Sequence, residues 1–382
     1  MKPRASKKIK LFVCGITPYD FAHLGHARTY LVFDAFAKYL RSKGLNVFYL
    51  QNVTDVDDKI IKRAKGLGKS WKEVSRTFEK EYLKDMKSLG ISSVTKYARA
   101  TEHIKEIISQ VHRLLQKGYA YEIKDDGIYY DVKKFKEYGK LSRRTIQQAE
   151  DGVSRIDESI QKRNRGDFAL WKFALPSWPS PWGSGRPGWH IEDTAITEKY
   201  FGAQYDIHGG GRDLMFPHHE AEIAQMEAIS HKKPLARFWM HSGFLTIGGE
   251  KMSKSLGNFI TIRDFLKNHP PRVLRLLFLK THYRSPIDYS EKLVLQTERE
   301  LERIDEFVDK LHEAHSMKHE TKKRFKLQAS RFTFYASRFM KAMEDDFNTP
   351  KAIAVVFDLI RKANPLLVKS VLEKKDAKQI LE

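Results

Sequence analysis

The sequence has very little cysteine, since Cys14 is the only one among its 382 residues. A lone cysteine cannot form an internal disulfide, so its thiol either belongs to the core or serves as a metal ligand or nucleophile. The chain also lacks any stretch approaching the roughly 20 apolar residues that a membrane-spanning helix needs. Its basic first ten residues are not followed by the apolar core of a signal peptide. We therefore expect a cytoplasmic protein without a membrane partner.

Tracts rich in Gly, Ser or Pro are also missing, whereas apolar residues make up 41% and aromatic residues 12% of the chain. Disordered chains lack the apolar surface that offsets the entropy cost of ordering, so this composition excludes a disordered protein. Domains typically hold about 100 to 200 residues. The length therefore favours two or three folded domains.

Acidic residues are scarce relative to basic ones, with 48 Asp and Glu against 69 Lys and Arg and a formal net charge of +21. Such an excess attracts polyanions and accelerates their encounter with the protein. Nucleic acid is therefore the leading candidate partner. A lysine-rich surface that only keeps the protein in solution explains the charge equally well, so charge alone does not decide between the two.

The first fifty residues have the pattern of a strand, a helix and a second strand. Residues 9–14 form a short apolar run that ends at Gly15, and residues 46–53 alternate between apolar and polar side chains. Between them, apolar residues recur at three- and four-residue steps over residues 27–42, as in a helix packed by one face. This order predicts one unit of a parallel sheet.

The remaining chain alternates between helical and strand-like patterns. We expect charged helices over residues 70–116, an insertion of short strands over residues 117–165, and the sheet pattern again at residues 188–211 and 238–247. Ligand sites in such sheets lie at the carboxyl ends of the strands. Beyond about residue 290, long charged amphipathic segments predict a separate helical bundle.

A first candidate nucleotide motif, His23-Leu-Gly-His26, follows the first predicted strand. The amides and the dipole at a helix N-terminus favour anions such as phosphate. Imidazole N–H groups there can donate to phosphate oxygens, and Gly25 leaves room for a nucleotide beside the backbone. Taken alone, such a histidine pair at a helix start is more often a surface pair or a metal-binding pair than a nucleotide site.

A second candidate motif, Lys251-Met-Ser-Lys254-Ser, follows a predicted strand and two glycines, Gly248 and Gly249. A loop of this kind can swing two ammonium groups over a bound nucleotide. There they would stabilise the charge that gathers on a pyrophosphate leaving group. The alternative interpretation is a solvated basic turn.

Together the two motifs resemble the two signatures of class I aminoacyl-tRNA synthetases. Further stretches, in this order along the chain, are similar to the cysteinyl enzymes of that class. They are Cys14-Gly-Ile-Thr-Pro-Tyr-Asp, Asn52-Val-Thr-Asp-Val-Asp-Asp-Lys, Asp167-Phe-Ala-Leu-Trp-Lys, Gly188-Trp-His-Ile-Glu, Asp206-Ile-His-Gly-Gly-Gly, Phe216-Pro-His-His-Glu and Asp346-Phe-Asn-Thr-Pro. The resemblance extends from about residue 9 to residue 360.

The resemblance implies an α/β fold, with a Rossmann-like parallel sheet that carries an insertion and is followed by an α-helical bundle. We therefore expect residues 1–116 and 166–250 to form the two halves of the catalytic domain, with residues 117–165 as a connective insertion. Residues 251–290 would hold the second motif and a stem-contact region. Residues 291–382 would form the bundle, without the anticodon-binding domain usual in the family.

The resemblance also implies the activity and the residues that carry it. The chain would activate L-cysteine with ATP and Mg²⁺, form cysteinyl-adenylate, and transfer the cysteinyl group to tRNA(Cys). Matching positions imply catalytic roles for His23, His26, Lys251 and Lys254. They imply ATP contacts by Thr17, His23, Gly25, His26, Gly209, Gly210, Gly211, Asp213 and Lys254. They imply contacts to the substrate cysteine by Thr54, Trp189 and His208.

A zinc ion is the expected cofactor, because a thiophilic ion can distinguish cysteine from serine by bonding its thiolate. The resemblance implies Cys14, His218 and Glu222 as ligands, together with Asp193, which stands where the usual pattern has a second cysteine. A carboxylate keeps the anionic charge of the site but is a harder ligand than a thiolate. We interpret the neighbouring His219 as a capping or core histidine and Glu220 as an ordinary helix carboxylate.

The acceptor of the cysteinyl group is less closely defined. Family members usually continue beyond the position of Glu382, so this sequence represents a truncated chain, a short enzyme, or a relative that does not read the anticodon. A cysteine ligase that acts on an amino-sugar, as in mycothiol synthesis, shares both signatures. An inactive tRNA-binding module is a third alternative. The basic charge and the Asp346-Phe-Asn-Thr-Pro segment favour tRNA, and we expect a monomer.

Overall fold

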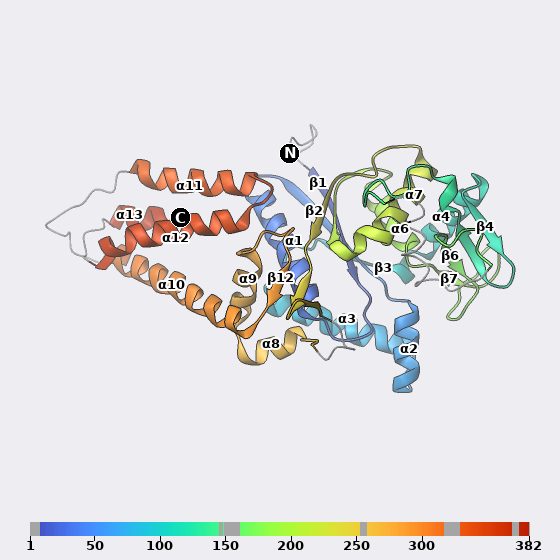
Figure 1. Ribbon diagram of the computed structural model, residues 1–382, viewed down its shortest axis with the longest axis horizontal. Coiled ribbons are helices and arrows are strands. Elements are labelled where there is room, and N and C mark those ends of the chain that lie inside the picture. The colour runs from blue at the N-terminus through green and yellow to red at the C-terminus, as the bar shows by residue number, and fades with distance from the viewer. Residues whose placement is uncertain are drawn as a thin grey trace. The chain divides into compact units, whose positions relative to one another are not determined.

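The structure is a computed structural model that describes residues 8–144, 148, 161–252, 258–316, 329–368 and 374–381. The chain divides into two compact units, Met1–Ser242 and Gly243–Glu382 (Figure 1). The first unit contains a parallel sheet, and the C-terminal part of the second consists of helices. The predicted fold class, an α/β parallel sheet with an insertion and a following helical bundle, is confirmed.

The sheet of the first unit has five parallel strands in the order β3-β2-β1-β8-β9. They are β1 (Lys8–Ile16), β2 (Asn46–Val53), β3 (Lys96–Arg99), β8 (Tyr205–Gly211) and β9 (Ala236–Ser242). Strand β1 is central, since Phe12 pairs with Leu50 of β2 and with His208 of β8. Because both faces of β1 are covered, its side chains from Leu11 to Val13 are completely buried.

Helices cover both faces of this sheet (Figure 1). Helix α1 (Leu24–Ser42) packs on β2, β8 and β9. Three other helices pack on one another, namely α4 (Ile104–Gln116), α6 (Ile191–Phe201) and α7 (Glu220–Ser230). They share a hydrophobic core with Phe12 and Cys14 of β1. Helices α2 (Asp58–Leu67) and α3 (Trp71–Ser88) lie between β2 and β3 in the chain, and the short helix η1 (Ala100–Glu102) follows β3. Asp57 and Ser70 cap α2 and α3 through their side-chain oxygens.

The residues of the predicted insertion, 117–165, contribute β4 and β5 to a small antiparallel sheet with the order β4-β5-β6-β7, whose other two strands follow residue 165. It consists of β4 (Ala120–Ile123), β5 (Gly127–Tyr130), β6 (Phe168–Lys172) and β7 (Arg186–Pro187), with the short helix η2 (Val132–Lys134) after β5. The fully buried Asp167 accepts hydrogen bonds from the Tyr121 hydroxyl and from the amides of Val132 and Asn164. This motif residue therefore holds the insertion together.

The second unit begins with a three-stranded sheet of β10 (Leu245–Ile247), β11 (Glu250–Lys251) and β12 (Ile287–Tyr289). Its helices are α8 (Ile262–Asn268), α9 (Pro271–Leu279), α10 (Glu291–Ser316), α11 (Ala329–Glu344), α12 (Thr349–Val368) and α13 (Lys374–Leu381). Between α11 and α12, Asp346 has a positive φ of 52° and accepts hydrogen bonds from the Tyr283 hydroxyl at 2.9 Å and from Arg284 Nε at 2.7 Å. These contacts fix the turn that carries the Asp346-Phe-Asn-Thr-Pro segment.

Three of the element predictions differ from the structure. Residues 238–247 are not one strand, because β9 ends at Ser242 and β10 belongs to the other sheet. Residues 188–211 include a helix, α6, whose first seven residues are all buried and therefore show no amphipathic period. Residues 70–116 include the strand β3 at the edge of the sheet. Among the described residues, no helix is long and apolar enough to cross a membrane.

Candidate active site

Four potential metal ligands converge at the carboxyl end of β1. Cys14 lies near the end of this strand, Asp193 in the first turn of α6, His218 in the turn η4 (Met215–His219), and Glu222 in the first turn of α7. One ligand atom from each side chain lies within 4.8 Å of the others, and all four residues are buried. The four residues that the family resemblance implied as ligands therefore lie together in the fold.

The imidazole of His218 is at the centre of this group. Its Nε2 lies 3.0 Å from Asp193 Oδ2 and 3.1 Å from Glu222 Oε1, while Cys14 Sγ lies 3.9 Å from the same Glu222 oxygen. Glu222 Oε2 is 3.2 Å from His208 Nε2, but it has no partner in hydrogen-bonding geometry among the described residues. A buried carboxylate oxygen without a donor is typical of a position that faces a cation.

The electrostatics of the group also favour a cation. Burial raises the pKa of the Cys14 thiol well above its usual value, and the carboxylates of Glu222 and Asp193 raise it further. Burial raises the pKa of Glu222 to about 8 against the opposing effect of His218. Burial would lower the pKa of His218, but Glu222 and Asp193 outweigh it and raise that pKa to about 10. The pocket therefore holds an excess of acidic groups that a divalent ion would compensate.

A second cluster shares the cysteine. Cys14 Sγ lies 3.3 Å from His208 Nε2 and 3.2 Å from His219 Nε2, and these three residues also form a possible metal-binding group. His219 Nδ1 contacts His241 Nε2 at 2.8 Å. Burial lowers the pKa of both His208 and His219 well below the usual value, so both rings are neutral near pH 7. The interpretation of His219 as a core histidine was incomplete, because it also contacts the candidate ligand Cys14.

Sequence reasoning also missed His190 and Asn52. His190 Nδ1 lies 2.8 Å from His218 Nδ1. Asn52 Oδ1 accepts a hydrogen bond from the Gly15 amide, and Asn52 Nδ2 donates to Asp193 Oδ1, both at 2.5 Å. The only sequence signal was that both residues lie inside the matched segments. Glu220, in contrast, is fully buried and accepts hydrogen bonds from the insertion, from Ser142 among others.

The three residues predicted to contact the substrate cysteine lie around this group. Trp189 stacks on His218 with ring centroids 4.4 Å apart and an interplanar angle of 18°. His208 is completely buried, and Thr54 is within 3.4 Å of Asn52 Nδ2. The structure thus brings Thr54, Trp189 and His208 next to the four candidate ligands.

The two histidines of the first nucleotide motif form the N-terminal cap of α1. His23 Nδ1 accepts a hydrogen bond from the Gly25 amide at 3.1 Å, and His26 Nδ1 accepts one from the His23 amide at 3.3 Å. Burial lowers the pKa of His26 to about 4, despite the opposing effect of the Asp213 carboxylate. Because Nδ1 is an acceptor in both rings, each neutral ring carries its proton on Nε2 and can donate from there.

The glycines of the Asp206 segment differ in their surroundings. A Cβ on Gly209 would lie 2.4 Å from the Phe33 ring of α1, so this glycine allows α1 to pack closely on the sheet. A Cβ on Gly210 would lie 3.0 Å from His219, and one on Gly211 would lie 2.5 Å from Asp213 Oδ1. Asp213 lies in the turn η3 (Arg212–Leu214) and is exposed. Packing thus explains Gly209 independently of any nucleotide.

The remaining candidates are Thr17, Lys251 and Lys254. Thr17 follows directly on β1 and is half-buried. Lys251 lies in β11 of the second unit. Lys254 lies outside the described residues. The roles of all three residues stay predictions.

The chain is similar to proteins of one family over most of its length. The family described as "tRNA synthetases class I (C) catalytic domain" matches residues 1–299, and the "DALR domain" family matches residues 338–382. A cysteine–tRNA ligase of Thermoplasma volcanium is 55% identical over 307 residues, which cover 80% of this chain and 67% of the relative. A cysteine–tRNA ligase of Thermococcus gammatolerans is 46% identical over 376 residues, which cover 96% of this chain and 78% of the relative.

Two solved structures share the fold at low sequence identity. The methionyl-tRNA synthetase of Mycobacterium tuberculosis in complex with methionyl-adenylate has a TM-score of 0.73 at 14% identity, covering 98% of this chain and 87% of that one. The LeuRS of Agrobacterium radiobacter K84 in a ternary complex with tRNA and LeuAMS has a TM-score of 0.75 at 11% identity, and the likeness covers 99% of this chain and 83% of that one. At such identities the likeness concerns the fold alone.

Proposed function

The chain belongs to the cysteine–tRNA ligase family of class I synthetases, and from this premise we propose that it activates L-cysteine with ATP and transfers the cysteinyl group to tRNA(Cys). One observation carries the proposal furthest. The donors Cys14, Asp193, His218 and Glu222, from four separate elements, meet at the carboxyl end of the central strand. The His23 motif follows the same strand, and α/β sheets bind their ligands at this edge.

The four donors fit a zinc ion. Thiolate, imidazole and carboxylate are all common zinc ligands, so these four residues would hold the ion. The unpartnered Glu222 Oε2 and the two carboxylates beside the Cys14 thiol support a cation at this position. A bound zinc supplies a thiophilic Lewis acid, to which a cysteine thiolate coordinates more strongly than a serine hydroxyl.

Asn52 would position the ligand that departs from the family pattern. Its amide engages Asp193 Oδ1 and leaves Oδ2, which lies beside His218, to face the other donors. Its carbonyl is held in turn by the Gly15 amide. Groups that hold a ligand in this way typically change metal affinity about 10- to 100-fold when they are removed. The Asn52 side chain would thus make Asp193 a one-oxygen ligand in place of a thiolate.

The first half-reaction would be adenylate formation. An oxygen of the cysteine carboxylate attacks the α-phosphorus of ATP, the bond to the bridging oxygen breaks, and pyrophosphate leaves with Mg²⁺. His23 and His26 would donate from Nε2 to phosphate oxygens at the N-terminus of α1, and Lys251 and Lys254 would neutralise the leaving group. Such catalysis consists mainly of positioning and charge stabilisation.

The other predicted contacts would orient the substrates. Trp189 would give the amino-acid pocket an apolar wall, with Thr54 and His208 as polar contacts beside it. Asp213 would accept from the ribose hydroxyls of ATP, next to the backbone of Gly209 and Gly211. In the second half-reaction, a terminal hydroxyl of tRNA attacks the carbonyl carbon of the adenylate and AMP leaves.

The test is cysteine-dependent exchange of pyrophosphate into ATP, followed by transfer to tRNA(Cys). We expect both activities, with exchange that depends on cysteine and not on serine. Absence of exchange from a folded protein would contradict the proposal and would favour a tRNA-binding module. Exchange combined with transfer only to glucosaminyl-inositol would replace tRNA by an amino-sugar acceptor. The expected cytoplasmic location and monomeric state stay predictions.

A further inference from the structure

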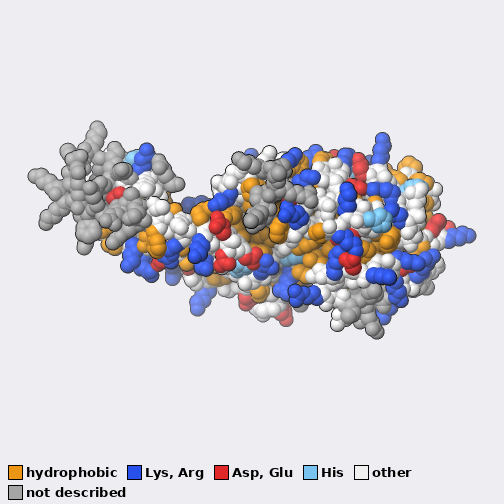
Figure 2. Space-filling view, turned by 90° about the horizontal axis from the view of Figure 1, so that it is seen from above, with side chains coloured by type: hydrophobic (Ala, Val, Ile, Leu, Met, Phe, Trp, Pro, Cys, Tyr) orange, Lys and Arg blue, Asp and Glu red, His pale blue; other side chains and the backbone are white. Residues whose placement is uncertain are grey.

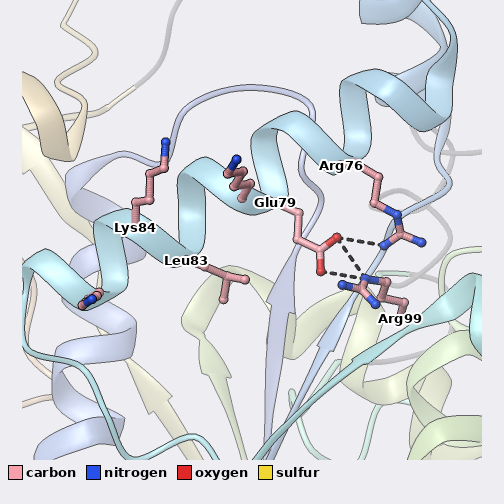
Figure 3. Close-up of a pocket in the computed structure, with 7 residues that line it drawn as sticks. Arg76, Glu79, Leu83, Lys84 and Arg99 are labelled. Carbon is pink, nitrogen blue, oxygen red and sulfur yellow. Dashed lines mark hydrogen bonds and ion pairs between the residues drawn. The ribbon is translucent and has the colours of Figure 1, made fainter.

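A shallow groove of about 360 Å³ lies along α3 and the end of β3, and none of the candidate active-site residues lines it (Figure 3). Five cationic side chains line it, namely Arg76, Lys80, Lys84, Lys87 and Arg99. Glu79 is the only acidic residue among those that line it. We call this feature the α3 groove. Figure 2 shows Lys and Arg side chains spread over a whole face of the molecule, so the number of cations alone does not single out the α3 groove.

The helical spacing places four of these cations on one face. Residues 76, 80, 84 and 87 follow one another at four- and three-residue steps, which brings their side chains to neighbouring positions on a helix. Over these 11 steps α3 rises by about 16 Å. Like charges at such spacings repel one another and destabilise a helix. Arg76 nevertheless stabilises the fold through its ion pairs with the buried Asp55 and Glu79.

Two arginines in the groove are held in place. Glu79 is only 3% exposed and accepts hydrogen bonds from Arg99 Nε at 2.8 and 3.0 Å and from Arg76 Nη1 at 2.9 Å, as Figure 3 shows. Arg99 also donates to Glu102 at 2.7 Å. Their guanidinium groups are thus ordered before any ligand binds, which lowers the entropy cost of binding.

The lysines are less engaged. Lys84 pairs with Glu81 at 2.7 Å, but neither Lys80 nor Lys87 has an ion-pair or hydrogen-bond partner within the part of the chain that the structure describes. Leu83 lies between Lys80 and Lys87 in the helix and is 36% exposed, so it offers an apolar contact in the groove. The α3 groove therefore combines ordered guanidinium groups, unpartnered ammonium groups and a small apolar contact.

We propose that the α3 groove binds the sugar-phosphate backbone of tRNA. Guanidinium groups recognise phosphate oxygens through paired hydrogen bonds, and ammonium groups do so as point charges. The row of cations extends over about 16 Å, which is long enough to meet several phosphates of one strand. Leu83 can pack against a ribose. The proposal rests on tRNA as the partner in the proposed function, and it adds a contact surface away from the reacting groups.

Backbone contacts carry no sequence information, so the α3 groove would contribute affinity but not tRNA identity. Removing it should raise the tRNA KM and weaken tRNA binding without altering amino-acid activation. Each lost phosphate contact lowers the slope of log affinity against log salt concentration by about 0.7 to 0.9. Loss of all three lysine contacts should therefore lower that slope by about 2.

The test is the triple variant Lys80→Gln, Lys84→Gln and Lys87→Gln of the full chain. Its matched control carries Lys105→Gln, Lys124→Gln and Lys232→Gln. These three lysines are exposed and lie in other segments of the same unit. Direct tRNA binding is measured by fluorescence titration between about 50 and 200 mM salt. The tRNA KM of aminoacylation and the rate of ATP–pyrophosphate exchange are measured on the same proteins, and circular dichroism checks the fold.

We expect the groove variant to bind tRNA at least tenfold more weakly with a reduced salt slope, and to keep its exchange rate within about twofold. The control should change tRNA affinity by less than about threefold. Equal losses in the two triple variants would assign the effect to net charge and overturn the proposal. Unchanged tRNA binding by the groove variant would also overturn it. If the unmodified chain catalyses no ATP–pyrophosphate exchange, the proposed function fails. The direct measurement of tRNA binding by the two triple variants still tests the proposal for the α3 groove in that case.

Discussion

Replacement of Asp193 by Asn tests the departure of this chain from its family most directly. The substitution keeps the size and the hydrogen-bonding capacity of the side chain but removes an anionic ligand oxygen. Structural zinc sites bind with about 10–16 kcal/mol, shared by four ligands, so one ligand contributes about 3 kcal/mol. At about 1.4 kcal/mol per factor of ten, the dissociation constant of zinc should rise at least about 100-fold.

The matched control is Asp206→Asn, because Asp206 is also a buried carboxylate but is engaged with the Lys10 amide. This control should keep the zinc affinity of the unmodified chain. Asn52→Ala should fall between the two, with a loss of about 10- to 100-fold, since it removes the group that orients Asp193. Asp193→Cys should bind zinc at least as tightly as the unmodified chain, because it supplies a second thiolate.

Zinc affinity would be measured by competition with a chromophoric chelator at constant pH, on protein stripped of metal. Cobalt substitution gives a second readout, because thiolate-to-cobalt charge-transfer absorption should increase when Asp193→Cys adds a sulfur ligand. Wild-type zinc affinity in Asp193→Asn would refute the ligand role of Asp193. Equal loss in Asp193→Asn and Asp206→Asn would instead indicate a general effect of removing buried carboxylates.

Three further predictions concern the pH dependence of the metal site, the second nucleotide motif and the sheet. The pKa of Cys14 is raised and that of His218 is about 10, so both side chains hold protons at neutral pH without metal. Zinc must displace these protons, so the zinc affinity should weaken as the pH falls from 9 to 6, with at least about one proton released per ion. Calorimetry in buffers of different ionisation enthalpy measures this proton release, and its absence would contradict the prediction. Lys254→Ala should lower ATP–pyrophosphate exchange about 10²- to 10³-fold with an unchanged melting temperature, and wild-type exchange would exclude its role. Gly209→Ala should lower the free energy of unfolding by about 1–3 kcal/mol, since the added methyl meets Phe33 at 2.4 Å; an unchanged melting temperature would show that α1 can shift without cost.

Much of the fold could be predicted because its first segments follow simple periodicities. The prediction of a strand, a helix and a strand at residues 9–14, 27–42 and 46–53 corresponds to β1, α1 and β2. The two strands pair in parallel, as predicted. The prediction failed where burial removes the period. Helix α6 is buried on all sides of its first two turns, so it showed no helical period and was predicted as part of the sheet.

The candidate metal group could be predicted only through the family resemblance. His218 and Glu222 stand four residues apart, as on one helix face, but Cys14 and Asp193 are 179 positions from each other. No local pattern joins residues that far apart. The structure adds Asn52, His190 and His219, which lie inside the matched segments but show no local pattern that predicts their roles, because a buried polar residue is recognised only by its partners.

The amino-acid sequence was enough to establish the lone thiol, the positive charge, the strand-helix-strand start and, through its motifs, the family. Only the tertiary structure decided that Cys14 has two sets of neighbours, one with Asp193, His218 and Glu222 and one with His208 and His219. The reason is physical. Periodicity and local motifs depend on neighbours along the chain, whereas a buried polar site depends on distances between strands and helices that approach one another only when the sheet is assembled.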